Sequence, residues 1–261
     1  MNKKYLAGGA LVVVIAVAVA AWFVFFKDDA PDAATNDAAN DAVDQVLADA
    51  ADTDDAVTDD ADAGADPAGD EPAPAVDGID GVWVIDDEFG ELTFESATGS
   101  FAGFRVAEEL TVGEVTAVGR SGDVNGSVTI ADGTLTGAEV TVGMDSIISN
   151  DSRRESAIRR AVNASEFPDA TFTFDGGVDV SAIEVGGASQ TFTIEGDLTV
   201  AGVTNPATFT IDANVRDDGF GVIVGSTEIV WEDFGVTPPS APIVVSIADE
   251  GTVEFQLIVA R

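Results

Sequence analysis

Apolar and polar residues alternate along much of the chain beyond residue 80. Phe192, Ile194 and Leu198 share one side of the segment 191–200, while threonine and acidic residues share the other side. A period of two is typical of a β-strand with one buried face. The same period recurs at residues 134–144, 171–174, 208–215 and 252–259, with turn-forming sequences between these segments. About eight strands at this spacing predict an all-β domain over residues 81–261, folded as an antiparallel sandwich or barrel.

A short helix is expected to interrupt the strands at about residues 152–164. Ser152 and Glu155 have the spacing of a capping box, in which each side chain satisfies a backbone N–H at the helix start. Ile158 and Val162 then fall on one side of the helix, and Pro168 prevents its continuation. The pattern predicts an amphipathic lid or plug packed against the sheet.

Residues 6–26 form an uncharged, apolar segment near the start of the chain. A helix of about 20 such residues spans a bilayer. Lys3 and Lys4 precede the segment, and Lys27, Asp28 and Asp29 follow it, so the positive-inside rule places the N-terminus in the cytoplasm and everything after Lys27 outside. We therefore expect residues 1–27 to be a single-pass anchor in the cell membrane, with an extracytoplasmic β-domain.

A cleavable signal peptide is the alternative interpretation of this segment. The sequence Ala18-Val19-Ala20 has the small-x-small form of a processing site. The anchor is favoured because the apolar run continues past this site to Phe26.

The next segment, residues 28–80, is rich in Asp and Ala. It carries 18 acidic residues and has no Lys, no Arg and no aromatic residue. Such a composition cannot bury enough apolar surface to offset the entropy cost of ordering the backbone. Val43, Val46, Leu47 and Ala50 have helical spacing, so a nascent helix is the alternative. The composition favours a disordered tether between anchor and domain.

Composition excludes several kinds of function. The chain of 261 residues has no His and no Cys, and its formal net charge is −37. Without these residues there is no Ser-His-Asp or Cys-His nucleophile, no disulfide, and no metal site with the usual nitrogen and sulfur ligands. The negative charge argues against a nucleic-acid partner, whose phosphates need a basic surface. Acidic pairs such as Glu108-Glu109 are expected to be solvated, so we predict no catalytic residue, no metal and no cofactor.

Several short segments between residues 81 and 261 form an ordered set of motifs. The central signature comprises Gly143 to Ser149, a helix from Asp151, and Phe167-Pro168-Asp169-Ala170-Thr171-Phe172. The flanking pieces are Trp83 to Asp86, Phe101 to Phe104, Gly196 to Thr204 and Asp233-Phe234-Gly235-Val236. In this order the segments resemble the YceI-like family of polyisoprenoid-binding, lipocalin-like proteins. The resemblance implies an eight-stranded antiparallel barrel around an apolar tunnel, framed by the helix, that holds an isoprenoid-type lipid.

The chain departs from the family at two positions. Where the family often reads Arg-Asp-x-His-Leu, this chain reads Arg154-Glu155-Ser156-Ala157-Ile158, and the Arg common two residues before Asp-Phe-Gly is Trp231. The roles of that His and that Arg therefore cannot be transferred, which leaves the chemistry at the lipid head group open.

Two sets of residues are candidates for the binding site. Large apolar side chains expected to face inward would line the tunnel, although each could equally fill the core: Phe101, Phe104, Met144, Ile147, Phe167, Phe172, Phe174, Phe192, Phe209, Trp231 and Phe234. Four arginines on the expected helix would form a cationic mouth for a phosphate or quinone head group, or else a solvated face paired with nearby acids: Arg153, Arg154, Arg159 and Arg160.

Three functions of different classes remain. The leading one is a membrane-tethered, extracytoplasmic protein that binds an isoprenoid-type lipid or a quinone inside the barrel. The second is a structural or partner-binding β-barrel without a ligand. An enzyme acting on lipid comes third, since the chain has no His, no Cys and no Gly-x-Ser-x-Gly elbow. The sequence does not indicate an oligomeric state.

Overall fold

The computed structural model describes residues 29–55 and 78–261. The expected anchor, residues 6–26, lies outside the described residues, as does the part of the expected tether at residues 56–77. Within the described ranges, no helix combines the length and the apolar character needed to cross a bilayer.

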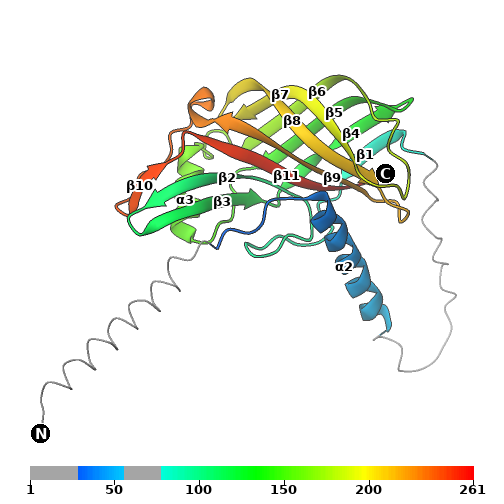
Figure 1. The fold of residues 1–261 in the computed structure, drawn as a ribbon, viewed down its shortest axis with the longest axis horizontal. Helices are drawn as coiled ribbons and strands as arrows, with labels where there is room; N and C mark the ends of the chain where they lie inside the picture. Colours follow the sequence, from blue (N-terminus) through cyan, green and yellow to red (C-terminus); the bar gives the residue numbers. More distant parts are fainter. Residues whose placement is uncertain (1–28, 56–77) are drawn as a thin grey trace, which may run out of the picture.

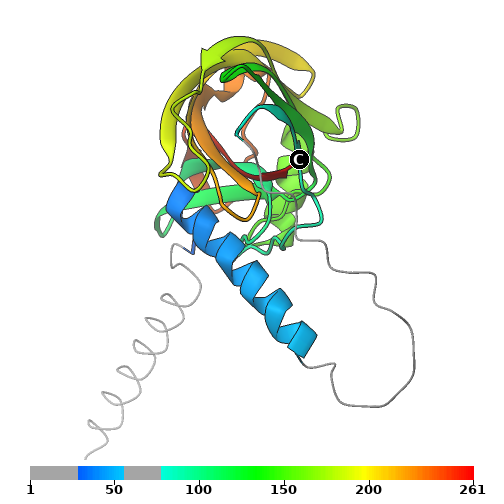
Figure 2. The same ribbon diagram turned by 90° about the vertical axis from the view of Figure 1, so that its right-hand side faces the viewer.

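A closed antiparallel β-barrel forms the body of the described structure (Figures 1 and 2). Eight strands follow one another around it in the order β1-β4-β5-β6-β7-β8-β9-β11, and β11 pairs back with β1. This ring confirms the eight-stranded antiparallel barrel. The strands of the ring are β1 (Gly81–Ile85), β4 (Val124–Ala131), β5 (Thr134–Gly143), β6 (Asp169–Asp179), β7 (Gln190–Val200), β8 (Val203–Val215), β9 (Gly221–Val230) and β11 (Glu250–Ala260).

Three further strands extend the sheet beyond the ring. One edge of β11 is shared, because β1 pairs with residues 259–260 and β2 pairs with residues 252–256. The strand β2 also pairs with β3 and, near its other end, with β10. The count of strands in the described residues is therefore eleven rather than about eight. The added strands are β2 (Phe101–Leu110), β3 (Gly113–Ser121) and β10 (Val244–Ile247).

The alternating segments of the sequence form strands with the expected inward faces. On β7, Ile194 and Leu198 are buried while Glu195 and Asp197 between them are exposed. Ile194 pairs with Phe209 of β8, which is also buried. A tight turn with positive φ at Ala201 (50°) and Gly202 (76°) joins the two strands. The register places both apolar faces inside the barrel.

The helix α3 (Ser152–Ala161) covers one end of the barrel, and its capping differs from the prediction. The N-cap is Asp151, whose Oδ1 accepts a hydrogen bond from the Arg153 amide at 2.7 Å. Glu155 accepts instead from the amide of Ser149 at 3.2 Å. The capping box is therefore wrong by one residue, because a carboxylate at position 151 is available to the free amides of the first turn. Ile158 is buried, as expected.

The prediction of disorder for residues 28–80 is wrong for the described part before residue 56. Residues 36–55 form a helix, α2 (Asn36–Asp55), whose first half lies on the outside of the barrel (Figures 1 and 2). Ala39 and Val43 are fully buried there against Val222 and Ile258. The sequence could not show the contacts of this helix with the barrel. An acidic helix that is only marginally stable alone is stabilised when one of its faces packs on a partner.

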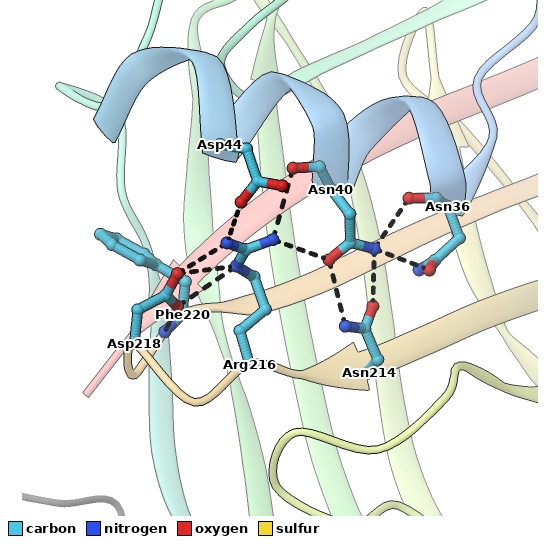
Figure 3. Close-up of polar contacts among 7 residues, drawn as sticks. All are labelled: Asn36, Asn40, Asp44, Asn214, Arg216, Asp218 and Phe220. Carbon is cyan, nitrogen blue, oxygen red and sulfur yellow. Dashed lines mark hydrogen bonds and ion pairs between the residues drawn. The ribbon is translucent and has the colours of Figure 1, made fainter. Parts of the chain in front are cut away.

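A polar network fixes α2 to the barrel (Figure 3). The side-chain amides of Asn40 and Asn214 exchange hydrogen bonds at 3.1 Å. The Arg216 guanidinium pairs with Asp44 of α2 and, at 2.7 Å, with Asp218 beside it. Hydrogen bonding to the Asp218 carboxylate, followed by that to Asp44, raises the pKa of Arg216. We call residues 29–55 the strap, because their first part, up to Asp44, is held on the outer surface of the barrel.

The start of the strap is held by buried charges. Arg105 Nη1 donates to the carbonyl of Pro31 at 2.7 Å, and Arg120 Nη2 donates to the carbonyl of Asp32 at 2.6 Å. Glu254, which is 2% exposed, pairs with Arg120. The amide of residue 34 donates to the second oxygen of the Glu254 carboxylate at 3.1 Å. These contacts order a segment that composition alone predicts to be disordered.

Candidate functional site

An apolar cavity of about 260 Å³ occupies the barrel interior. Its wall comes from the inward faces of the strands and from α3, which contributes Ile158. Toward the end of the barrel farther from α3, the wall consists of buried side chains, among them Trp83, Val180 and Ile183. At the α3 end, Pro239 of the segment between β9 and β10 both lines the cavity and is exposed. The cavity therefore reaches the surface beside α3.

Eight of the eleven residues predicted to line the tunnel do line this cavity. They are Phe104, Met144, Ile147, Phe172, Phe192, Phe209, Trp231 and Phe234.

The other three predicted lining residues lie elsewhere. Phe101 is buried on the outer side of β2, where the Arg120 guanidinium stacks 4.3 Å from its ring centre. Phe167 packs at the β7–β8 turn, close to Gly202. Phe174 packs on the edge of the core and does not line the cavity. For Phe101 the prediction is wrong because the sequence does not show which face of its strand turns inward. Phe167 precedes β6 and is not on a strand, and Phe174 shares the inward face of Phe172 but lies beyond the cavity.

Aromatic contacts organise the cavity wall. The rings of Phe172 and Phe209 meet edge to face with centroids 5.1 Å apart, and Phe209 contacts Phe255 at 5.5 Å. Nearer the open end, Phe104 meets Trp231 edge to face at 5.7 Å. Such pairs contribute roughly 0.5–1.5 kcal/mol beyond burial, so these rings are stiff parts of the wall.

Much of the wall consists of aliphatic residues that the sequence analysis left out. The alternating pattern could have identified them, because it places them on the same inward strand faces as the predicted lining residues. Examples are Val140 and Val142 of β5, Ile223 of β9, and Val253 and Leu257 of β11.

One buried ion pair lies at the α3 end of the cavity. Glu108 of β2 and Arg154 of α3 both line it, with 3.0 Å between Arg154 Nη2 and Glu108 Oε2. The Glu108 side chain is 8% exposed, whereas its neighbour Glu109 is exposed, so the expectation that both are solvated is wrong for Glu108. Sequence reasoning missed Glu108 because an Arg 46 residues away makes its burial possible.

The predicted cationic mouth reduces to this one arginine. Arg153 points into solvent, where its side chain is 93% exposed and pairs with the N-cap Asp151 at 3.5 Å. Arg159 donates to the backbone carbonyl of Ile147 at 3.2 Å, and Arg160 is exposed. Among the four, Arg154 alone lines the cavity. The others form a basic outer face of α3.

The buried polar groups at the site are paired with other groups of the protein. Within residues 29–55 and 78–261, no three acidic residues gather as a set of metal ligands. Every buried side-chain nitrogen or oxygen in the same ranges has a hydrogen-bond partner. The arrangement can hold an apolar chain in the barrel and place one polar end near Arg154.

Several solved structures are similar to this chain at low sequence identity. A polyisoprenoid-binding domain from Saccharophagus degradans, implicated in plant cell wall breakdown, matches 69% of this chain and 97% of its own with 15% identity and a TM-score of 0.51. BcnA of Burkholderia cenocepacia matches 60% of this chain and 95% of its own with 18% identity and a TM-score of 0.46. The match to the YCEI protein of Campylobacter jejuni covers 55% of this chain and 84% of that protein, with 18% identity and a TM-score of 0.44.

The family comparison gives a direct assignment, although no curated protein is a significant match to this sequence. The model of the YceI-like domain matches residues 83–259, which is more than half of the chain and nearly all of the barrel. The resemblance noted in the sequence is thereby confirmed, and the chain belongs to the YceI-like domain family.

Proposed function

We propose that the barrel binds an isoprenoid-type or similar amphiphilic lipid in its interior and performs no chemistry on it. The observation that carries this proposal is the cavity, which has an apolar wall and opens beside the Arg154–Glu108 pair. A binding site for a lipid needs both features, an apolar space for the tail and a polar position for the head group. The similar domain from Saccharophagus degradans is a polyisoprenoid-binding domain, which supports this proposal.

The size of the cavity favours a slender ligand. About 260 Å³ lies just below the roughly 300–1,000 Å³ of sites for compact drug-sized molecules. Each methylene moved from water into the cavity contributes about 0.8 kcal/mol, so a tail of a few prenyl units dominates affinity. Arg154 then discriminates among head groups, because its guanidinium can donate hydrogen bonds to a phosphate or to a quinone oxygen.

The proposal also includes membrane attachment. Residues 6–26 are uncharged and apolar over the length of a membrane-spanning helix, with Lys3 and Lys4 before them. In this arrangement the barrel stands outside the cytoplasm and takes its ligand from the adjacent bilayer. Protease added to intact cells is expected to remove the barrel while the N-terminus stays protected, whereas a soluble mature protein beginning at Ala21 would contradict the anchor.

Native mass spectrometry tests the ligand. The purified chain is stripped of lipid and offered a prenyl phosphate, a prenyl quinone and a straight-chain fatty acid of similar carbon number. One bound prenyl lipid per chain, with a raised thermal midpoint, is the expected result. If none of the three binds or stabilises the protein, the barrel is a structural or partner-binding domain instead.

A further inference from the structure

The start of the strap lies beside the opening of the cavity. Asn150, which precedes α3, donates from Nδ2 to Asp29 Oδ1 at 2.8 Å. The same Asn150 accepts a hydrogen bond from Arg154, whose other partner is Glu108. Glu108 is in turn paired with Ile247 of β10 across the sheet. Asp29, α3 and β10 therefore meet at one end of the barrel (Figure 1).

The strap leaves no slack between this end and the expected anchor. Residues 31–34 are held by Arg105, Arg120 and Glu254, as described above. Only residues 27 and 28 separate Phe26, the last residue of the apolar segment, from Asp29. The three steps from Phe26 to Asp29 span at most about 11 Å of extended chain. A flexible tether of the kind expected from composition would have allowed the barrel to stand much farther away.

The α3–β10 end of the barrel carries exposed basic and apolar side chains. Arg153 and Arg160 are exposed on α3, where Arg153 pairs with Asp151. Ile243, just before β10, and Val245, on β10, are large apolar side chains with 41% and 57% exposure. The headgroup layer on one side of a bilayer is about 5–8 Å thick, so Asp29, at most about 11 Å of chain from the apolar segment, is held at or close to this layer.

We propose that the strap holds the α3–β10 end of the barrel against the membrane, so that the cavity opens directly onto the lipid headgroups. We call these four residues, Arg153, Arg160, Ile243 and Val245, the rim. The occupant of the rim is the outer leaflet of the bilayer that residues 6–26 are expected to span. This inference rests on the membrane attachment in the proposed function, and it adds an orientation and a route by which a lipid enters.

The absence of Cys makes the orientation measurable with single labels. Ser240 lies in the exposed segment near the rim, and Ser189 lies in the exposed loop at the opposite end, roughly 25 Å away for strands of this length and tilt. The variants Ser240→Cys and Ser189→Cys of the full chain are labelled with bimane. Each is reconstituted in vesicles of phosphatidylcholine with a quarter of phosphatidylglycerol and a headgroup nitroxide quencher.

The expected result is several-fold stronger quenching at position 240 than at position 189. Inserting a flexible linker of about 30 Gly and Ser residues between Asp28 and Asp29 should abolish the difference, because it adds slack before the strap. The matched control places the same linker between Asp66 and Pro67, after the strap, and should leave the difference intact.

Equal quenching at both positions in the parent chain would overturn the orientation. A difference that survives the linker before Asp29 would show that the strap does not set it, and would overturn the proposal equally. Prenyl-lipid binding is measured on the same samples in detergent, so failure of the orientation is distinguishable from failure of lipid binding. A chain that does not float with the vesicles contradicts the anchor and the orientation together.

Discussion

Arg120 and Glu254 form a buried ion pair between β3 and β11, with Arg120 Nη2 2.7 Å from Glu254 Oε1. The two residues are 134 positions apart in the sequence, and both also bind the strap. The pair thus connects the barrel wall to the segment that leads toward the N-terminus. A buried pair of this kind is costly to break, because the remaining charge is left without a partner.

Replacing Glu254 by Gln should destabilise the protein by roughly 3–5 kcal/mol, since Arg120 and Arg105 lose their buried counter-charge. The measurement is urea unfolding of residues 29–261. Glu139→Gln, at an exposed position on β5, is the control and should change stability by less than about 0.5 kcal/mol. Equal effects of the two substitutions would show that the buried pair has no special role.

Val43→Asp should detach α2 while leaving the barrel folded. Val43 is fully buried between α2 and the outer face of β9, so a carboxylate there is desolvated without a partner. Hydrogen exchange is expected to show loss of protection in α2 and unchanged protection in β7 and β8. Asp41→Ala, on the exposed side of the helix, should leave α2 protected. Uniform loss of protection in both parts would contradict separate docking of the strap.

Asp151→Ala should destabilise the protein by about 0.5–2 kcal/mol at neutral pH, as loss of an N-cap does. The Arg153 amide lowers the pKa of the Asp151 carboxyl below 3.8. The contribution of Asp151 is therefore complete above that pH and is lost as pH falls through the lower, folded-state pKa. Urea midpoints of the variant and the parent should converge in strong acid, whereas Asp145→Ala should have little effect at any pH. A constant difference down to pH 2 would contradict the linkage.

Arg154 should govern the preference for charged head groups. The double variant Arg154→Met with Glu108→Gln removes the charge without leaving a buried carboxylate unpaired. It is expected to bind a prenyl quinone nearly as well as the parent and a prenyl phosphate about tenfold more weakly or worse. Arg153→Ser, which changes an exposed arginine on the same helix, is the control. A similar loss in both variants would place discrimination in the general charge of α3.

Alternation predicted an all-β sandwich or barrel because a period of two is a local property that directly reports a half-buried strand, and the family resemblance implied the barrel. It also predicted Phe192 and Phe209 as inward residues, and both line the cavity. It could not place Phe101, because that required knowing that β2 lies beside β11 with its odd-numbered residues outward. The local pattern therefore predicted most of the residues that line the cavity, whereas the position of Phe101 depends on the strand register.

Pairing between distant residues explains what the sequence did not predict. Glu108 is buried because Arg154 reaches it from α3, and α2 is ordered because Val222 and Ile258 offer it an apolar surface. In each case the deciding partner is far away along the chain. The acidic composition of residues 28–80, which is poor in aromatic residues, predicts disorder. Residues 36–55 are nevertheless ordered, because one face of the helix packs on the barrel.

The central claim, that the cavity holds the lipid, is tested most directly by filling it. Ala138 of β5 lines the cavity, and its neighbour Glu139 points outward into solvent. Ala138→Trp and Glu139→Trp place the same bulky side chain on the two faces of one strand, at a stability cost from overpacking of about 1–3 kcal/mol for the first. Native mass spectrometry after incubation with a prenyl quinone should show bound lipid in the parent and in Glu139→Trp, and none in folded Ala138→Trp. Undiminished binding by Ala138→Trp, or lipid in none of the three proteins, would contradict the account.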